Sequence, residues 1–374
     1  MIKRHQQSTV PRVPVSLDVS LTGKCNLRCQ YCFYADAMAT LDDLPTDSWR
    51  AFFAEAGAVG VRRLTLSGGE VFTRPDLFAL IDSAIENGMR YAILTNGTLI
   101  SEATVAAFNE GRRLIRLDSI QVSIDGSSSA IHDLSRPPAS FERALRGLRL
   151  LKEHNFPMTA RVTINRHNVH DLPNIARLLL DDIGLRSFST NSADRFGSAR
   201  CSGQDVLLST EEWRIAVRTM AKLSRSYPGR ISATAGPLAF AEDAARIKSV
   251  LATGGTGLPG RGTLSACGGV FSKMAVLHNG AIVPCNMLPT MIMGKIGFTP
   301  LDDVWLHGRE INVLRERHET SITSIAGCSD CRYAGFCTGG CPAVVYTRYG
   351  RLDAVDPGSC YKKYREESHV PLRP

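Results

Sequence analysis

The chain has 374 residues, 44% of them hydrophobic, so it is long enough to bury a sizeable core in two domains or in one large domain with an extension. Its formal charge of +8 comes from basic residues scattered through helical segments, which indicates a solvated surface rather than a site for an acidic leader peptide or electron-donor protein, and we expect no nucleic-acid partner. It contains no run of about 20 apolar residues and no apolar signal-peptide centre, so we expect a cytoplasmic protein that does not bind a membrane.

The first half of the chain alternates short β-branched runs with longer amphipathic stretches. This alternation predicts six βα units around a parallel sheet. The expected strands are residues 15–20, 63–66, 91–94, 120–124, 159–164 and 187–190, and the expected helices include 46–59, 75–87 and 141–154. Ligand sites of parallel sheets collect at the carboxyl ends of the strands, so functional residues are expected in the loops that follow them.

The pattern changes near residue 200. Residues 201–247 have a helical pattern, and the glycine-rich stretch 253–260 then interrupts regular structure as a flexible loop would. Beyond it we expect cysteine-rich turns, a hairpin over 275–284 around Asn279-Gly280, and a short helix over 301–315. The expected organisation is a tail (1–14), an α/β unit (15–200), a helical bridge with a linker (201–263) and a small loop-rich domain (264–374).

The eleven cysteines are concentrated at residues 25–32 and 328–341. In a reducing compartment such clustering indicates metal rather than disulfides. Cys25, Cys29 and Cys32 follow the first expected strand with the spacing C-x3-C-x2-C. Zinc sites usually pair cysteines as C-x2-C, whereas three thiolates from one loop leave one iron of an iron-sulfur cluster open. An iron-sulfur cluster is therefore preferred over a zinc knuckle or a redox thiol pair.

This spacing, with the aromatic Tyr31 before the third cysteine, resembles the radical S-adenosylmethionine (SAM) superfamily. The resemblance implies a 4Fe-4S cluster whose open iron is chelated by SAM. It also implies that one electron cleaves SAM to methionine and a 5'-deoxyadenosyl radical, which abstracts a hydrogen atom from the substrate. No catalytic acid or base is assigned, and the histidines are interpreted as surface or capping residues.

The following loops extend the resemblance. Ser67-Gly68-Gly69-Glu70 corresponds to the family loop at the SAM amino group, and Ser123 to a contact of the ribose. Arg136 and Arg161 are candidates for the SAM carboxylate because a guanidinium group matches its geometry, and Asn165 is a weaker candidate. Each of these residues taken alone also suits an ordinary turn or a surface charge. The implied cofactor-binding residues are Tyr31, Ser67, Gly68, Gly69, Glu70, Asn96, Ser123, Asp125, Arg136 and Arg161.

Seven cysteines lie in the C-terminal part: Cys267, Cys285, Cys328, Cys331, Cys337, Cys341 and Cys360. Their central run C-x2-C-x5-C-x3-C, and a glycine five residues before Cys285, resemble the SPASM domain of radical SAM peptide and protein maturases. The resemblance implies a first auxiliary cluster on Cys267, Cys285 and Cys341, and a second on Cys328, Cys331, Cys337 and Cys360. Seven thiolates cannot complete two four-iron clusters, so the first has an open iron, a non-cysteine ligand or Cys201. A pair of structural zinc sites is the alternative.

The two resemblances together predict an α/β fold: a partial (β/α)6 TIM-like barrel followed by a small loop-rich iron-sulfur (SPASM) domain, with three 4Fe-4S clusters. Family members with this extension modify ribosomally made peptides or protein side chains. Sulfatase-maturing members have an aspartate base where this chain has Asn286, and an amide cannot accept that proton. Residues 122–126 and 161–170 resemble proteins of SynChlorMet-type peptide cassettes.

Oxidative crosslinking of a precursor peptide, through a C-C, C-O or thioether bond, is therefore the expected reaction. Peptide epimerisation and side-chain oxidation are the enzymatic alternatives, and a non-catalytic zinc-containing module that binds peptides is the alternative from another class. Only about 14 residues precede the first expected strand, so we expect a separate small leader-recognition protein. A low-potential electron donor such as flavodoxin or ferredoxin is the other expected partner.

Overall fold

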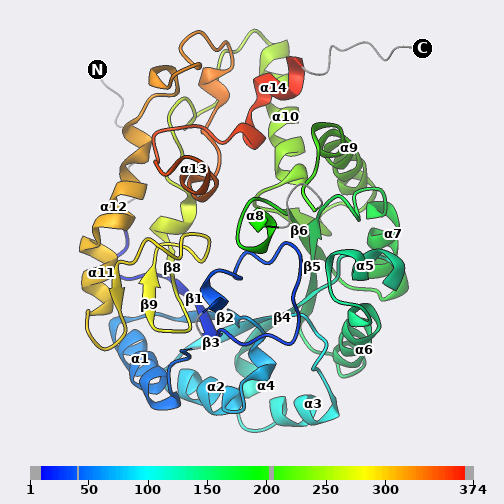
Figure 1. Cartoon of the computed structure of the whole chain (residues 1–374), viewed down its shortest axis with the longest axis vertical. Helices are drawn as coiled ribbons and strands as arrows, with labels where there is room; N and C mark the ends of the chain where they lie inside the picture. Colours follow the sequence, from blue (N-terminus) through cyan, green and yellow to red (C-terminus); the bar gives the residue numbers. More distant parts are fainter. Residues whose placement is uncertain (1–9, 40–41, 202–205, 367–374) are drawn as a thin grey trace.

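The computed structural model describes residues 10–39, 42–201 and 206–366, without the side chains of Ala39, Cys201 and Glu366. Within this part of the chain, ten strands form one sheet in the order β10-β9-β8-β1-β2-β3-β4-β5-β6-β7 (Figure 1). The strands are β1 (Ser16–Thr22), β2 (Arg63–Gly68), β3 (Arg90–Thr95), β4 (Leu117–Ser123), β5 (Met158–Ile164), β6 (Phe188–Ser192), β7 (Ile231–Ala233), β8 (Lys273–Val276), β9 (Ala281–Val283) and β10 (Gly294–Lys295). Strands β1 to β7 are parallel, as the βα alternation predicts.

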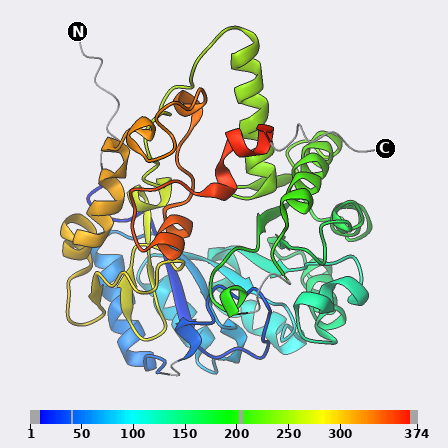
Figure 2. The same ribbon diagram turned by 45° about the horizontal axis from the view of Figure 1, so that its top comes forward.

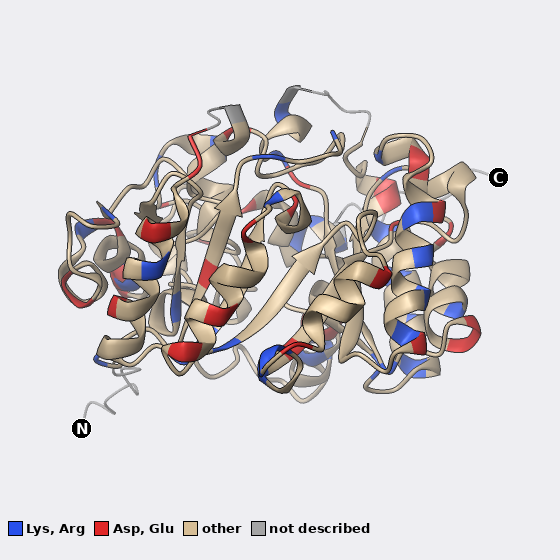
Figure 3. Ribbon diagram, turned by 90° about the horizontal axis from the view of Figure 1, so that it is seen from below, with Lys and Arg blue, Asp and Glu red and all other residues tan. Residues whose placement is uncertain are grey.

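Helices follow most of the strands, and α1 to α7 cover the outer rim of the curved sheet (Figure 1). The helices of the described residues are α1 (Thr46–Val59), α2 (Leu77–Glu86), α3 (Glu102–Phe108), α4 (Arg113–Arg116), α5 (Ser129–Ser135), α6 (Ser140–Glu153), α7 (Leu172–Arg177), α8 (Ser198–Cys201), α9 (Thr210–Ser226), α10 (Pro237–Ala252), α11 (Leu301–His307), α12 (Arg309–Glu316), α13 (Pro342–Tyr349) and α14 (Tyr361–Glu366). Basic and acidic residues alternate along the outer helices, in agreement with the expected solvated surface (Figure 3). No helix among the described residues is long and apolar enough to cross a membrane.

The strands bury one face and leave the other partly accessible. In β5, Ala160 and Val162 are fully buried, whereas Arg161 and Thr163 between them are only partly buried. Successive side chains of a strand point to opposite faces, so the apolar residues pack under the helices and the polar ones line the concave face. The concave face therefore offers polar groups next to the loops at the carboxyl ends of the strands.

Two expectations for the second half of the chain require correction. The stretch 201–247 is not wholly helical, because β7 lies between α9 and α10 and extends the parallel sheet. Three residues are too short a run for a period to be visible in the sequence. The single helix expected over 301–315 is two helices that meet at Gly308, where a Cβ would lie 2.5 Å from the carbonyl oxygen of Val304.

The expected helix over 46–59 is present as α1 with the same bounds. The helix expected over 75–87 begins later, because α2 starts at Leu77 and is flanked by Asp76. Asp76 also accepts a hydrogen bond from the Thr46 hydroxyl, so the starts of α1 and α2 are in contact.

The C-terminal segment joins the sheet rather than standing apart from it. The expected hairpin is present as β8 and β9, and β8 also pairs in parallel with β1. Trp305 of α11 is fully buried in the main core, and its indole nitrogen donates to the Pro11 carbonyl oxygen at 2.7 Å. Figure 2 shows the last segments standing over one side of the sheet beside α10, where the rings of Phe240 and Tyr364 are 5.0 Å apart.

Candidate active site

Cys25, Cys29 and Cys32 lie in the loop that leaves β1 at the carboxyl edge of the sheet. The Gly-Gly-Glu loop after β2 lies directly beneath it: the backbone N–H of Gly69 donates to Thr22 O at 2.7 Å, and that of Glu70 to Lys24 O at 2.8 Å. A Cβ at position 69 would be 2.1 Å from Lys24 O. Glycine is therefore required there for the two loops to approach this closely.

Glu70 is buried, and its hydrogen bonds, together with one from Asn96, link the loops that follow β1, β2 and β3. Its carboxylate accepts hydrogen bonds from Thr95 Oγ1 at 2.7 Å and from the backbone N–H groups of Asn96 at 2.7 Å and Phe72 at 3.3 Å. The Asn96 amide in turn donates to Asn26 in the cysteine loop at 2.9 Å. Burial raises the pKa of Glu70, although these donors favour its charged form. Glu70 and Asn96 thus hold the loops together, and a direct contact of either residue with SAM stays a prediction.

A buried group of Tyr31, Asp125 and Arg136 supports the same loop from the other side. Arg136 Nε donates to Asp125 Oδ2 at 2.5 Å, the Tyr31 hydroxyl donates to the same oxygen, and the backbone N–H of Thr163 donates to Asp125 Oδ1 at 2.7 Å. Arg136 also reaches Cys29 Sγ at 3.8 Å. Burial disfavours the charge on Arg136, but Asp125 outweighs it and raises the pKa of the guanidinium. The guanidinium is therefore committed to Asp125 and Cys29.

Arg161 differs from Arg136 in having few partners. It lies on β5 beside Ser123 of β4, and its Nη1 donates to Ser189 Oγ at 3.1 Å. Within the described residues this is the side chain's single recorded hydrogen bond, and burial lowers its pKa. A partly desolvated guanidinium with unused donors is suited to bind an anion. Ser67 points back to its own sheet, with its hydroxyl 3.5 Å from Val19 O.

The donor chemistry of the cysteine loop fits an iron-sulfur cluster. Burial raises the pKa of all three thiols, that of Cys32 to about 11, so iron coordination must supply the free energy of deprotonation. Arg136 donates to Cys29 Sγ, and hydrogen bonds to ligand sulfurs tune iron-sulfur clusters, so this contact is compatible with such a site. Across residues 10–39, 42–201 and 206–366, no three His, Cys, Asp or Glu side chains converge on a position for a single metal ion.

The structure sorts the seven C-terminal cysteines into two groups. Burial, followed by the proximity of Cys341 and Cys267, raises the pKa of Cys285 to about 11. The pKa of Cys337 is raised by burial and then by its neighbours, which are Cys360, Cys328 and Cys331. These groups are the two ligand sets implied by the resemblance, while the roles as ligands stay predictions. The side chain of Cys201 lies outside the described residues, so its recruitment is not addressed.

Comparison with known protein families decides the class of this chain. Residues 19–179 match the model described as "Radical SAM superfamily", and residues 267–332 match "Iron-sulfur cluster-binding domain", the SPASM domain. The chain belongs to the radical SAM superfamily. It is an enzyme whose cofactors are SAM and iron-sulfur clusters, and the alternative of a non-catalytic zinc module is not supported.

The relatives of this radical SAM enzyme include heme synthases and peptide cyclases. It is 27% identical over 349 residues to an AdoMet-dependent heme synthase from Methanosarcina barkeri, covering 91% of this chain and 95% of the relative. It is 26% identical over 356 residues to a PqqA peptide cyclase from Ruegeria pomeroyi, covering 94% and 88%. The fold is that of Streptococcus suis SuiB bound to precursor peptide SuiA, with a TM-score of 0.70 at 16% identity over 95% of this chain and 78% of SuiB.

Two supports of the radical SAM loop are not apparent in the sequence. The backbone N–H of Ser198 donates to Cys32 O at 3.0 Å, and a Cβ at Gly197 would be 2.1 Å from that same oxygen. His278 contacts Tyr34, just after the third cysteine, from the SPASM hairpin. In the sequence Gly197 resembles an ordinary turn glycine, and His278 is interpreted, like the other histidines, as a surface or capping residue. Only the fold brings these residues to residues 25–34.

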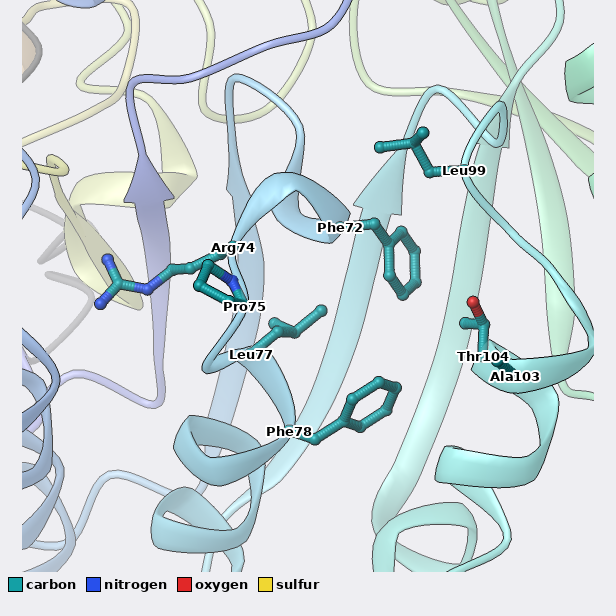
Figure 4. A pocket seen from close by; sticks show the side chains of 8 residues that line it. All are labelled: Phe72, Arg74, Pro75, Leu77, Phe78, Leu99, Ala103 and Thr104. Carbon is teal, nitrogen blue, oxygen red and sulfur yellow. The ribbon is translucent and has the colours of Figure 1, made fainter.

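A pocket between α2 and α3 lies apart from the cysteine loop (Figure 4). Phe72, Phe78 and Leu99 point into it, whereas Arg74 points away and pairs with Asp76 at 2.8 Å. The pocket therefore presents no charged group to a ligand.

Proposed function

We propose that this radical SAM enzyme modifies a ribosomally synthesised precursor peptide by hydrogen-atom abstraction and oxidative crosslinking. One observation is the main support for this proposal. The three-cysteine loop is held, through Tyr34 and His278, against a C-terminal segment whose seven cysteines form two groups. The kinship to a PqqA peptide cyclase supports a peptide substrate. Asn286 supports crosslinking over formylglycine formation, because its buried amide oxygen cannot take the place of an aspartate base.

The residues near the cysteine loop have different roles at the first cluster. Cys25, Cys29 and Cys32 would hold a 4Fe-4S cluster, which with SAM supplies the 5'-deoxyadenosyl radical. Arg136 stabilises the thiolate of Cys29, and Asp125 keeps that guanidinium in place. Arg161 is the better of the two arginines for the SAM carboxylate, because its donors are not committed to another carboxylate.

The two C-terminal groups would hold auxiliary clusters, giving three clusters in all. Cys267, Cys285 and Cys341 form the first site, where Lys273 lies beside the thiols. The second site is Cys328, Cys331, Cys337 and Cys360. An electron acceptor held in these positions suits a reaction that removes two hydrogens from the substrate. A separate leader-recognition protein and a flavodoxin or ferredoxin complete the proposed system.

The test is anaerobic incubation of the reconstituted enzyme with SAM, a reductant and a candidate precursor peptide. Crosslinking predicts that the peptide loses two hydrogen atoms per bond while 5'-deoxyadenosine forms. Deoxyadenosine without a mass loss in the peptide contradicts the proposal. Deuterium uptake from heavy water at otherwise unchanged mass identifies epimerisation instead.

A second candidate is modification of an iron porphyrin, since the chain is as similar to heme synthases as to peptide cyclases. The observation that favours it is the 27% identity to an AdoMet-dependent heme synthase over 91% of this chain. The same assay with an iron porphyrin carboxylate separates the two functions. A mass change confined to the porphyrin supports this candidate, and one confined to the peptide contradicts it.

A further inference from the structure

The β8–β9 hairpin connects the two cysteine regions of the molecule. At one end, β9 leads through Pro284 into Cys285, which belongs to the first C-terminal group. At the other end, the turn carries His278 and lies against the segment that follows β1. Figure 1 shows β8 and β9 beside β1, and the parallel pairing of β8 with β1 fixes this arrangement.

His278 is only 1% exposed, although it belongs to a turn. Its Nδ1 is 2.8 Å from the Tyr34 hydroxyl, and the two rings pack edge to face with centroids 5.8 Å apart. Its Nε2 is 3.5 Å from Asp42 Oδ1. If Nε2 carries the proton and faces Asp42, Nδ1 is free of a proton and accepts the hydrogen bond from the Tyr34 hydroxyl. Asp42 and Tyr34 therefore favour one tautomer and one orientation of the His278 ring.

His278 contacts both sides of the three-cysteine stretch. A Cβ at Gly23, two residues before Cys25, would lie 2.9 Å from His278 Nε2. Tyr34, on the other side, is two residues after Cys32. A backbone hydrogen bond adds a third contact later in the chain, where Leu44 N–H donates to His278 O at 2.8 Å.

Apolar packing and a carboxylate reinforce the same junction. Tyr34 is buried in a small cluster made otherwise of hairpin residues, with Cys32 packed against it: Ala275, Leu277, Ala281 and Val283. Asp43 accepts from Thr22 Oγ1 at 2.5 Å and from Gly23 N–H at 2.6 Å. The cysteine stretch 25–32 contains no helix or strand, so these contacts fix its conformation.

We propose that His278 is a positioning residue for the radical cluster: acting through Tyr34 and Gly23, it makes the SPASM hairpin set the geometry of the Cys25–Cys32 loop. This inference rests on the proposed assignment of a SAM-binding cluster to Cys25, Cys29 and Cys32. Residues that hold a metal ligand in place through a hydrogen bond change metal affinity or activity by about 10- to 100-fold when replaced. We expect an effect in this range on SAM binding.

The experiment compares the reconstituted full chain with Y34F, H278F and the double variant. Y34F removes one oxygen and keeps the apolar packing. Y227F is the matched control, because it removes a tyrosine hydroxyl bonded to Asp181 on a remote helix. Three quantities are measured: the SAM-induced change in the electron paramagnetic resonance spectrum of the reduced enzyme, the KM for SAM, and the iron content.

Each single variant is expected to raise the KM for SAM about 10-fold and to alter the SAM-induced spectrum, with iron content unchanged. The effect of the double variant is expected to be smaller than the two single effects combined, because both single variants remove the hydrogen bond between His278 Nδ1 and the Tyr34 hydroxyl. Additive effects, an unchanged spectrum and KM, or equal loss of all iron would each overturn the proposal. Absence of any SAM-induced change in the native chain would instead refute the cluster assignment on which it rests.

Discussion

Asp125 shows how a single carboxylate organises a site assembled from distant parts of the chain. It accepts hydrogen bonds from the cysteine loop through Tyr31, from Arg136 after α5, and from the backbone of β5. Its side chain is fully buried, as is nearly all of that of Arg136. Breaking such a pair leaves an uncompensated charge in the interior, which is more costly than loss of the pair as a whole.

We therefore predict that D125N lowers the free energy of unfolding by about 3–5 kcal/mol, because Arg136 keeps its charge without a partner. Chemical denaturation, monitored by circular dichroism, measures this change in the free energy of unfolding. D118N is the control: its partner Arg90 is 39% exposed, and such surface pairs contribute less than about 1 kcal/mol. Equal effects of the two variants would contradict a special role of the buried pair.

For Arg161 we predict a binding defect. A hydrogen bond to a charged group contributes about 1.5–3 kcal/mol, so R161Q is expected to raise the KM for SAM about 10- to 100-fold. R161K keeps the charge without the fork geometry and is expected to lie between R161Q and the native enzyme. The readout is 5'-deoxyadenosine release over a range of SAM concentrations. R112Q, at an exposed position beside α4, is expected to leave KM unchanged.

At the scale of elements, the loops after β1 and β2 act as one unit because their backbones touch. Their two hydrogen bonds and the absence of a Cβ at Gly69 allow this approach. The sequence signals each loop separately, by its cysteines and by its glycines. The need for glycine at position 69 comes from the neighbouring loop and not from its own turn.

G69A is therefore expected to displace Lys24 and Cys25 and to remove about four bound irons together with SAM cleavage, while the auxiliary irons stay. Iron and acid-labile sulfide analysis checks this. G111A provides the comparison, because a Cβ there meets nothing within 4 Å and costs only the strain of a positive φ, about 1–2 kcal/mol. Full iron content in G69A would show that the loop accommodates the methyl group.

At the scale of the whole molecule, the radical SAM and SPASM matches share one sheet and one core. β8 pairs with β1, and α11 contributes Leu301, Val304 and Trp305 to the main core. Smaller apolar clusters form around the second cysteine group, with Leu264, Ile322 and Ile325 packed by cysteines. The barrel and the start of the SPASM segment are therefore expected to unfold together.

W305A tests this. Removing a fully buried tryptophan is expected to cost about 3–5 kcal/mol and to shift one cooperative transition reported by both barrel and SPASM signals. L306A replaces the adjacent, 37% exposed leucine and is expected to cost far less. Two separate transitions in W305A, with the barrel signal unmoved, would show that the parts fold independently.

The sequence alone predicted the six principal strands, the class of cofactor and the superfamily, because each depends on local information. Period-2 and period-3.6 patterns mark strands and helices, and ligands on one loop sit at fixed spacing. Through the resemblance to SPASM domains it also predicted two sets of cysteine ligands, and these sets stay a prediction. It did not reveal β7, which is too short to show a period, or the division at Gly308.

The tertiary structure decided which polar residues meet. Tyr31 and Asp125 are 94 positions apart, and Tyr34 and His278 are 244 apart, so no local pattern links them. It also separated two arginines that are equivalent in the sequence: Arg136 is paired with a buried carboxylate, and Arg161 keeps free donors on the concave face. The physical reason is that burial and the geometry of distant neighbours set the charge state and partners of a side chain, and both exist only in the folded chain.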